Sequence, residues 1–440
     1  MTTTPARPAS RDGAAAPSPL PPPPAAPLPA APARAGYARL PQLAGRAFLP
    51  VAFLARLPFS MLTIGTLLLV TSTTSSVALG GLASAATALG TAVGGPAQGV
   101  LADRVGQRRV LLVCVPLATL AVLGLVLAAS APGASAPQVG PLARVRWLRL
   151  AHAEPRTVGA AMSYESTADE VSFVLGPALV GVLASAGSPQ AAVLAAAGGI
   201  AVFGTAFALH PTARAAAPHA PDAEPAPGTT DAPVGATPAP ATPRVGTAAL
   251  VRREGVALVG MLAMGLLFGG TQAALTALTR DAGVPGSAGL VYAVMGVGSA
   301  VTALAVVALP RRWGLRGRWV TFAAGLLAGT LALVLAAAGG SLAAVVVAVA
   351  ATGLFVGPVM VTVFTVAGER APAGRTAAAM TLVASANVVG VATGASGGGA
   401  LADGVATTAA FALPVVAAAL LVVTGVSLTS RPQVDRDRVV

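Results

Sequence analysis

Apolar runs of about 20 residues alternate with short polar segments through most of the chain. A helix needs about 20 apolar residues to cross a hydrocarbon core about 30 Å thick, so each such run predicts a membrane-spanning helix. In the first half the predicted spans cover 48–71, 77–100, 109–129, 157–186 and 189–209. In the second half they cover 254–279, 287–309, 318–338, 341–366, 375–401 and 404–429.

Two stretches rich in proline and alanine interrupt this pattern. Residues 1–47 and 211–252 hold few large apolar side chains, and such a composition cannot bury enough surface to fold. The first stretch also lacks the charged and then apolar layout of a cleaved signal peptide. We therefore expect five parts: a disordered cytoplasmic tail at 1–47, a transmembrane half at 48–210, a cytoplasmic linker at 211–252, a second transmembrane half at 253–429 and a cytoplasmic tail at 430–440.

Composition excludes a water-soluble domain. Hydrophobic residues make up 55% of the chain and charged residues only 10%, against about 25% charged residues in soluble domains. The net charge of +12 would suggest a nucleic-acid partner, but such proteins gather basic side chains on one face. Here the arginines stand in short groups between apolar runs, so we expect the lipid bilayer and not nucleic acid as the partner.

Most arginine groups fall in alternate loops, which places them on one side of the membrane. They are Arg104, Arg108 and Arg109; Arg144, Arg146, Arg149 and Arg156; Arg214, Arg244, Arg252 and Arg253; Arg311, Arg312, Arg316 and Arg318; Arg370 and Arg375; and Arg431, Arg436 and Arg438. Only Arg280 falls in a loop of the opposite side. Because cytoplasmic loops collect positive charge, we expect a bacterial plasma-membrane protein with both termini in the cytoplasm.

The same argument predicts a twelfth span. The arginine groups at 104–109 and 144–156 lie on one side, so residues 110–143 leave the cytoplasm and return. Only 34 residues are available there, against about 40 for two full spans. We therefore predict a short fourth span near 131–149, interrupted by proline and glycine. The fold class is then an all-α membrane protein of twelve spans in two six-helix halves.

The loop after the second span reads GVLADRVGQRR, from Gly99 to Arg109. It resembles the G-x-L-A-D-R-x-G-x-R-R signature of the major facilitator superfamily, and the number and order of spans over 48–429 agree with that family. Segments also match between the halves in the same order, as RTVGAAM at 156–162 does with RTAAAM at 375–380. The resemblance implies a major facilitator fold whose two halves rock against each other.

In that family the signature loop holds the two halves together and gates their movement. Gly99 would allow a neighbouring helix to approach closely, and Gly106 would permit a tight turn. Asp103 would face a helix N-terminus or an arginine. The remaining positions of the motif are cationic and would anchor the loop at the headgroups: Arg104, Arg108 and Arg109.

Four ionisable residues fall well inside predicted spans, where a charge is costly and therefore a functional candidate. They are Arg56 in the first span and Glu165, Asp169 and Glu170 in the fifth. Glu165 and Asp169 are four residues apart and share a helical face, whereas Glu170 points elsewhere. Since the resemblance implies that these spans meet at a central cavity, we expect Arg56 to pair with Glu165 or Asp169. The pair is either a proton-coupling centre or a structural ion pair.

The fifth span ends in LGPALVG, residues 175–181, which resembles an element of drug/proton antiporters. Gly176 and Pro177 match that element, but Gly181 is displaced by one position and the double glycine is absent. The match favours an exporter, and a plain proline kink explains it equally well. Met61, Gln272 and Asn387 are weaker candidates for cavity-lining residues.

We expect a monomeric proton-coupled exporter of a small amphipathic molecule that works by alternating access and needs no cofactor or metal. The chain has no lysine and so no phosphate-binding G-x-x-x-x-G-K-[ST] segment, its histidines do not cluster, and no catalytic constellation appears. Three alternatives stay open. One is a metabolite uptake facilitator. Another is a sensor or interaction protein derived from a transporter, which the short fourth span would favour. The third, an enzyme embedded in the membrane, is disfavoured by the lack of a catalytic constellation.

Overall fold

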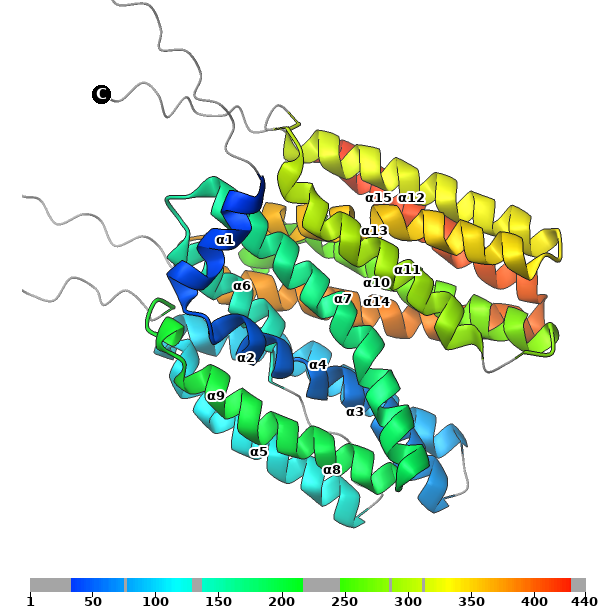
Figure 1. Cartoon of the computed structure of the whole chain (residues 1–440), viewed down its shortest axis with the longest axis horizontal. Coiled ribbons are helices and arrows are strands. Elements are labelled where there is room, and N and C mark those ends of the chain that lie inside the picture. The colour runs from blue at the N-terminus through cyan, green and yellow to red at the C-terminus, as the bar shows by residue number, and fades with distance from the viewer. Residues whose placement is uncertain are drawn as a thin grey trace, which may run out of the picture. The chain divides into compact units, whose positions relative to one another are not determined.

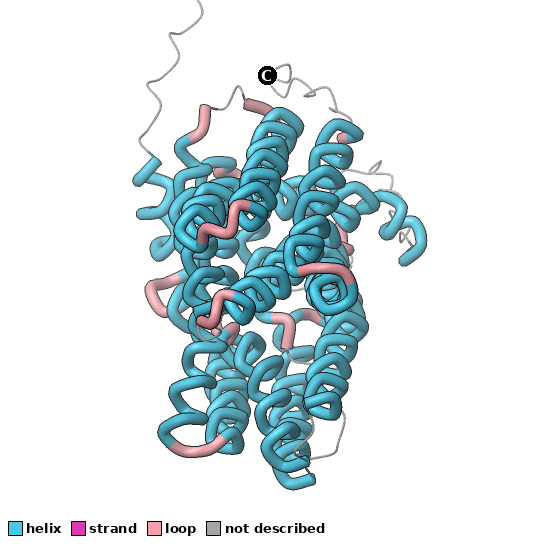
Figure 2. Tube along the Cα trace, turned by 90° about the vertical axis from the view of Figure 1, so that its right-hand side faces the viewer, coloured by secondary structure: helices cyan, strands magenta, loops and turns pink. Residues whose placement is uncertain are grey.

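The computed structural model describes residues 33–74, 77–128, 137–216, 246–284, 287–310 and 313–428. Helices and connecting loops make up these ranges, which contain no strand (Figure 1, Figure 2). In the same ranges ten helical segments are long and apolar enough to cross a membrane. With the 29-residue helix α4 and the short helix α6, a helix occupies each of the twelve predicted positions.

The first half follows the predicted order, with a break in its first span. A turn at Ala55 and Arg56 separates α2 from α3, and a π-helical turn, η1, joins α8 to α9. The elements are α2 (Phe48–Leu54), α3 (Leu57–Thr74), α4 (Val77–Val105), α5 (Gln107–Ala128), α6 (Val139–Leu150), α7 (Pro155–Ala186), α8 (Pro189–Gly199), η1 (Ile200–Gly204), α9 (Thr205–Leu209) and the short 3-10 turn η2 (Pro211–Ala213).

The second half has longer and more continuous helices. Its elements are α10 (Thr247–Asp281), α11 (Ala288–Ala305), the 3-10 turn η4 (Val306–Ala308), α12 (Leu315–Ala338), α13 (Leu342–Arg370), α14 (Thr376–Gly404), the 3-10 turn η5 (Thr407–Phe411) and α15 (Ala412–Ser427). Helices α10 and α14 lie side by side with their backbones in contact (Figure 1). A Cβ atom on Gly269 of α10 would lie 2.1 Å from the carbonyl oxygen of Val391, so only glycine permits this approach.

Residues 33–44 form helix α1, whereas the sequence predicted a disordered tail over 1–47. Tyr37, Leu40 and Ala44 recur at helical spacing, and Leu40 and Ala44 are buried, which gives α1 an apolar face to pack. The linker predicted at 211–252 also has structure at its ends, because α10 begins at Thr247. Residues 1–32, 217–245 and the predicted tail at 430–440 lie outside the described ranges.

Helix α1 contacts both halves of the chain. It packs against α7, where a Cβ atom on Gly36 would lie 3.2 Å from that of Ala160. The hydroxyl of Tyr37 donates a hydrogen bond to the carbonyl of Leu304 in α11. Arg39 pairs with Glu154 at 3.3 Å. The hydrogen bond from the hydroxyl of Thr157, together with Arg39, holds the pKa of Glu154 below its usual range.

Replacing Tyr37 with phenylalanine should lower the free energy of unfolding by about 1 kcal/mol, because one intramolecular hydrogen bond is lost while the ring is kept. Unfolding of the purified protein in detergent measures this change. Arg39→Gln is the matched control, since a solvent-exposed ion pair contributes little. A larger loss in Arg39→Gln than in Tyr37→Phe would contradict the prediction.

Helix α6 explains why the fourth span is short. Its 12 residues extend about 18 Å, which is less than the hydrocarbon thickness of about 30 Å. Residues 139–147 are all buried, and they include Arg144 and Arg146, which the sequence placed in a cytoplasmic loop. Arg146 donates to the side chains of Gln107 and Thr212 and to the carbonyl of Phe207, so its charge is solvated by protein groups. Residues 131–136 of the predicted span lie outside the described ranges.

Candidate functional site

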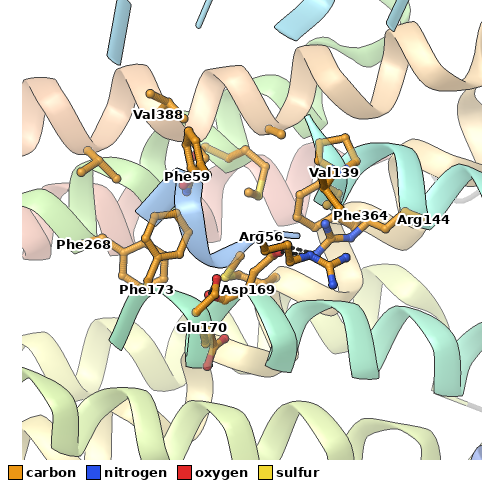
Figure 3. Close-up of a pocket in the computed structure, with 18 of the residues that line it drawn as sticks. Arg56, Phe59, Val139, Arg144, Asp169, Glu170, Phe173, Phe268, Phe364 and Val388 are labelled. Atoms are coloured by element: carbon orange, nitrogen blue, oxygen red, sulfur yellow. Dashed lines mark hydrogen bonds and ion pairs between the residues drawn. The ribbon is translucent and has the colours of Figure 1, made fainter. Parts of the chain in front are cut away.

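A cavity of about 160 Å³ lies among helices of both halves of the chain (Figure 3). From the first half it is lined by the break between α2 and α3, by the start of α3, by α6 and the two residues before it, and by α7. From the second half α10, α11, α13 and α14 complete the wall. Most of its lining is apolar, with phenylalanine and methionine side chains, and charged groups are confined to the first half.

Three buried charged side chains and the partly buried Asp169 meet at one end of this cavity. The Arg56 guanidinium contacts the Glu165 carboxylate, and its Nε atom lies 3.0 Å from Oδ1 of Asp169. The other oxygen of Asp169, Oδ2, accepts a hydrogen bond of 2.7 Å from Nη2 of Arg144. Glu165 also accepts a 2.7 Å hydrogen bond from the indole of Trp147. We call these four residues, Arg56, Glu165, Asp169 and Arg144, the ion cluster.

Local structure positions each member of the ion cluster. Arg56 lies in the turn between α2 and α3, where the chain leaves the helical path and directs the side chain inward. Glu165 and Asp169 are one helical turn apart on α7, so both carboxylates face the same arginine. Figure 3 shows Asp169 beside Arg56. A Cβ atom on Gly140 of α6 would lie 3.0 Å from Oδ1 of Asp169 and 3.3 Å from Nε of Arg56, so a larger residue there would displace these side chains.

Sequence reasoning missed Arg144. Its side chain is fully buried and its guanidinium lies over the Phe364 ring, 3.8 Å from the ring centroid. The available signal was the apolar segment VGPLARVRW, in which arginines at 144 and 146 are flanked by residues typical of a buried helix. The physical reason is that α6 has only 12 residues, so Arg144, although close to the predicted end of the span, lies in the protein interior.

Glu170 lies outside the ion cluster but lines the same cavity. Only 8% of the residue is exposed, and neither carboxylate oxygen has a hydrogen-bond partner among the described residues. Ser299 of α11 lies close to it and also lines the cavity. Asn387, a weaker candidate from the sequence, lines the cavity as well, whereas Met61 packs in a separate apolar cluster and Gln272 is exposed.

The signature loop joins the two halves at the C-terminal end of α4. Asp103 accepts hydrogen bonds from the backbone amides of Ala377 and Ala378, at 3.0 and 2.8 Å. These amides belong to the first turn of α14, where N–H groups have no partner within the helix and attract a negative charge. A Cβ atom on Gly99 would lie 2.6 Å from the carbonyl oxygen of Ala377, so glycine is required for this contact.

The glycine and the arginines of the signature loop have the conformation and exposure expected from the sequence. Gly106 has a φ of +91°, in the left-handed region that favours glycine, and it separates α4 from α5. Arg104, Arg108 and Arg109 are exposed, as expected for side chains that reach toward headgroups. Arg311, which the repeat aligns with Asp103, lies outside the described ranges.

Gly176 and Pro177 lie within α7, which continues past them to Ala186. A Cβ atom on Gly176 would overlap the hydroxyl of Ser60, and this hydroxyl donates a 2.7 Å hydrogen bond to the carbonyl of Ser172. Gly176 therefore allows α3 and α7 to approach closely. In the described ranges no three His, Cys, Asp or Glu side chains gather closely enough to hold a metal ion.

The family profile of the Major Facilitator Superfamily matches residues 48–394, which is most of the chain. The chain belongs to the major facilitator superfamily. The resemblance noted in the signature loop and the predicted fold class, an all-α membrane protein of this family, are thereby confirmed. A search of curated proteins finds no match.

Solved structures of other major facilitators share the fold at low sequence identity. The human organic anion transporter MFSD10 is 18% identical, with a TM-score of 0.62 over 87% of this chain and 99% of its own. A bacterial homologue of the iron transporter ferroportin, in an outward-facing state, is 16% identical, with a TM-score of 0.65 over 87% and 98%. The Escherichia coli fucose:proton symporter FucP is 14% identical, with a TM-score of 0.58 over 87% and 99%.

Proposed function

We propose that this major facilitator is a secondary active transporter that moves a small molecule across the plasma membrane by alternating access and exports it in exchange for protons. The observation that carries the proposal is the ion cluster at the wall of the cavity, where Asp169 joins two buried arginines. Buried charges are costly, and a network whose members can gain or lose a proton can couple proton movement to a change of shape.

The chemistry follows from the connections of Asp169. Each of its oxygens faces one arginine, so protonation would remove the charge that holds Arg56 and Arg144 together. Arg56 belongs to the turn between α2 and α3, and Arg144 belongs to α6. Protonation would therefore loosen the packing of three elements around the cavity, α7 being the third. Release of the proton would restore it.

The contact of Asp103 with α14 is the second part of the proposed cycle. It ties α4 of one half to α14 of the other at the end predicted to face the cytoplasm. Opening the cavity to the cytoplasm would require this contact to break, and the reverse movement would form it again. Two conformations of similar free energy, with one stabilised by ligand or proton, are sufficient for such a cycle.

The proposal is tested in proteoliposomes with a pH-sensitive dye inside and an imposed pH gradient. A screen of small molecules should find compounds whose addition releases protons from the vesicles, and everted membrane vesicles should accumulate them. Accumulation of the same compounds in right-side-out vesicles instead would show uptake and contradict the proposed direction. No compound-dependent proton flux for any tested class would contradict the coupling.

Glu165→Gln and Asp169→Asn should each lower the compound-dependent proton flux by about tenfold or more, since each removes one titratable member of the ion cluster. Glu369→Gln is the matched control, because this carboxylate lies at the end of α13, is exposed and does not line the cavity. Thermal unfolding of each variant verifies folding. Full proton-coupled flux in both cluster variants would reduce the cluster to a structural ion pair.

A further inference from the structure

We infer that the cavity binds amphipathic organic monocations and that the Glu170 carboxylate pairs with their positive charge. This inference rests on the proposed function, because it names the class of molecule that the transporter would move. It adds a group with a role separate from the ion cluster, since Glu170 contacts neither arginine of that cluster. The charges, the apolar wall and the unpartnered oxygens each support it.

The charge balance of the site leaves one negative group without compensation. In the ion cluster two arginines face two carboxylates, and their formal charges cancel. Glu170 is the remaining ionisable side chain of the described lining. It is more than nine-tenths buried, and no hydrogen-bond donor of the described residues satisfies either oxygen. A buried carboxylate without a partner is costly, and a ligand cation would lower that cost.

The apolar wall suits the rest of such a ligand. Phe173 lies one helical turn from Glu170 on α7, and its ring meets the Phe59 ring at 5.9 Å between centroids, edge to face. Phe268 lies on the same side of the cavity, as Figure 3 shows. Aromatic faces attract cations, and phenylalanine with the flexible Met295 gives an adaptable surface for an apolar body.

An organic anion is the opposite possibility, and the positive groups of the site argue against it. Arg144 already binds Asp169 and lies over Phe364, and Arg56 is shared by two carboxylates. The amides that begin α6 are also engaged. Those of residues 138 and 139 donate to Gln98 and to the carbonyl of Pro137. Two donor atoms of Arg144, Nε and Nη1, have no hydrogen-bond partner among the described residues, but the charge of Arg144 is balanced by Asp169. No arginine pairs with Glu170 in the described ranges, and the uncharged hydroxyl of Ser299 lies beside it.

The test measures binding to the purified full-length protein with two probes of similar size and opposite charge, benzyltrimethylammonium and benzylsulfonate. Isothermal titration calorimetry in nanodiscs gives both affinities. The wild type should bind the cation at least about tenfold more tightly than the anion. Glu170→Gln should remove this preference, and Glu170→Asp, which keeps the charge, should retain it with weaker binding. Glu369→Gln should bind as the wild type does.

Preference for the anion would overturn the inference and assign the cavity to Arg144. An unchanged cation preference in Glu170→Gln, or no binding of either probe by the wild type, would also overturn it. If Glu170→Gln fails to fold, Glu170→Asp decides, because loss of the cation preference there would contradict the role of the charge. Cation binding without proton flux in proteoliposomes would contradict the transport proposal alone. Proton flux with other compounds but no cation binding would contradict this inference alone.

Discussion

Replacing Arg56 with leucine should lower the free energy of unfolding by about 3–5 kcal/mol. Among the described residues, the substitution would leave the fully buried Glu165 with the Trp147 indole as its one partner, and Asp169 with Arg144 alone. An unpaired charge inside the protein costs far more than the loss of the pair itself. Denaturant titration in detergent measures the loss. Arg39→Leu, which breaks the exposed pair with Glu154, is the control and should change little.

The double variant Arg56→Leu with Glu165→Leu should regain most of this stability, because two apolar side chains replace a buried ion pair and Asp169 still faces Arg144. Its proton flux should stay at least about tenfold below that of the wild type if the ion cluster couples transport. Recovery of both stability and flux would assign Arg56 and Glu165 to helix packing. The double variant thus separates the two roles that the sequence left open.

Replacing Gly99 with alanine should reduce transport by about tenfold or more. The new Cβ atom would lie 2.1 Å from the hydroxyl of Thr381 and 2.6 Å from the carbonyl oxygen of Ala377. The hydroxyl can turn away, but the backbone carbonyl cannot. The helices α4 and α14 would have to separate, and Asp103 would lose its bonds to the first turn of α14.

Accessibility of a cysteine at position 378 measures this separation in a Cys114→Ser background, which removes the single native cysteine. Ala378 is buried and packs near Val100, so a thiol there should react slowly with a maleimide unless Gly99→Ala is present. Gly159→Ala is the control, because a Cβ atom there meets nothing within 4 Å. Since alanine favours helix over glycine, equal reactivity and flux in Gly99→Ala and the control would refute the close-contact argument.

The arrangement of helices could be predicted because it depends on length and periodicity. Apolar runs gave a helix for each span, and a spacing of four residues placed Glu165 and Asp169 on one face, where both contact Arg56. Asp103 meets a helix N-terminus, one of the two environments that its charge suggested. The gating and coupling roles of these residues stay predictions.

The sequence could not give features that depend on tertiary contacts. Arginine near a span end is normally cytoplasmic. Burial of Arg144 depends on two tertiary contacts, the Asp169 carboxylate of α7 and the Phe364 ring of α13. The proline and alanine content predicted disorder up to residue 47, but the apolar face of α1 packs against α7. Glu170 was recognised as a buried charge, whereas its place on the cavity wall depends on residues from six other helices.

Helix α1 also has a consequence for the populations of the two conformations. It rests on α7 of the first half and is bonded through Tyr37 to Leu304 at the end of α11 in the second half. Any movement that separates these helix ends must break that bond or displace α1. A contribution of about 1 kcal/mol changes the ratio of two states about fivefold. In the proposed cycle, helix α1 would therefore stabilise the conformation in which the ends of α7 and α11 lie together.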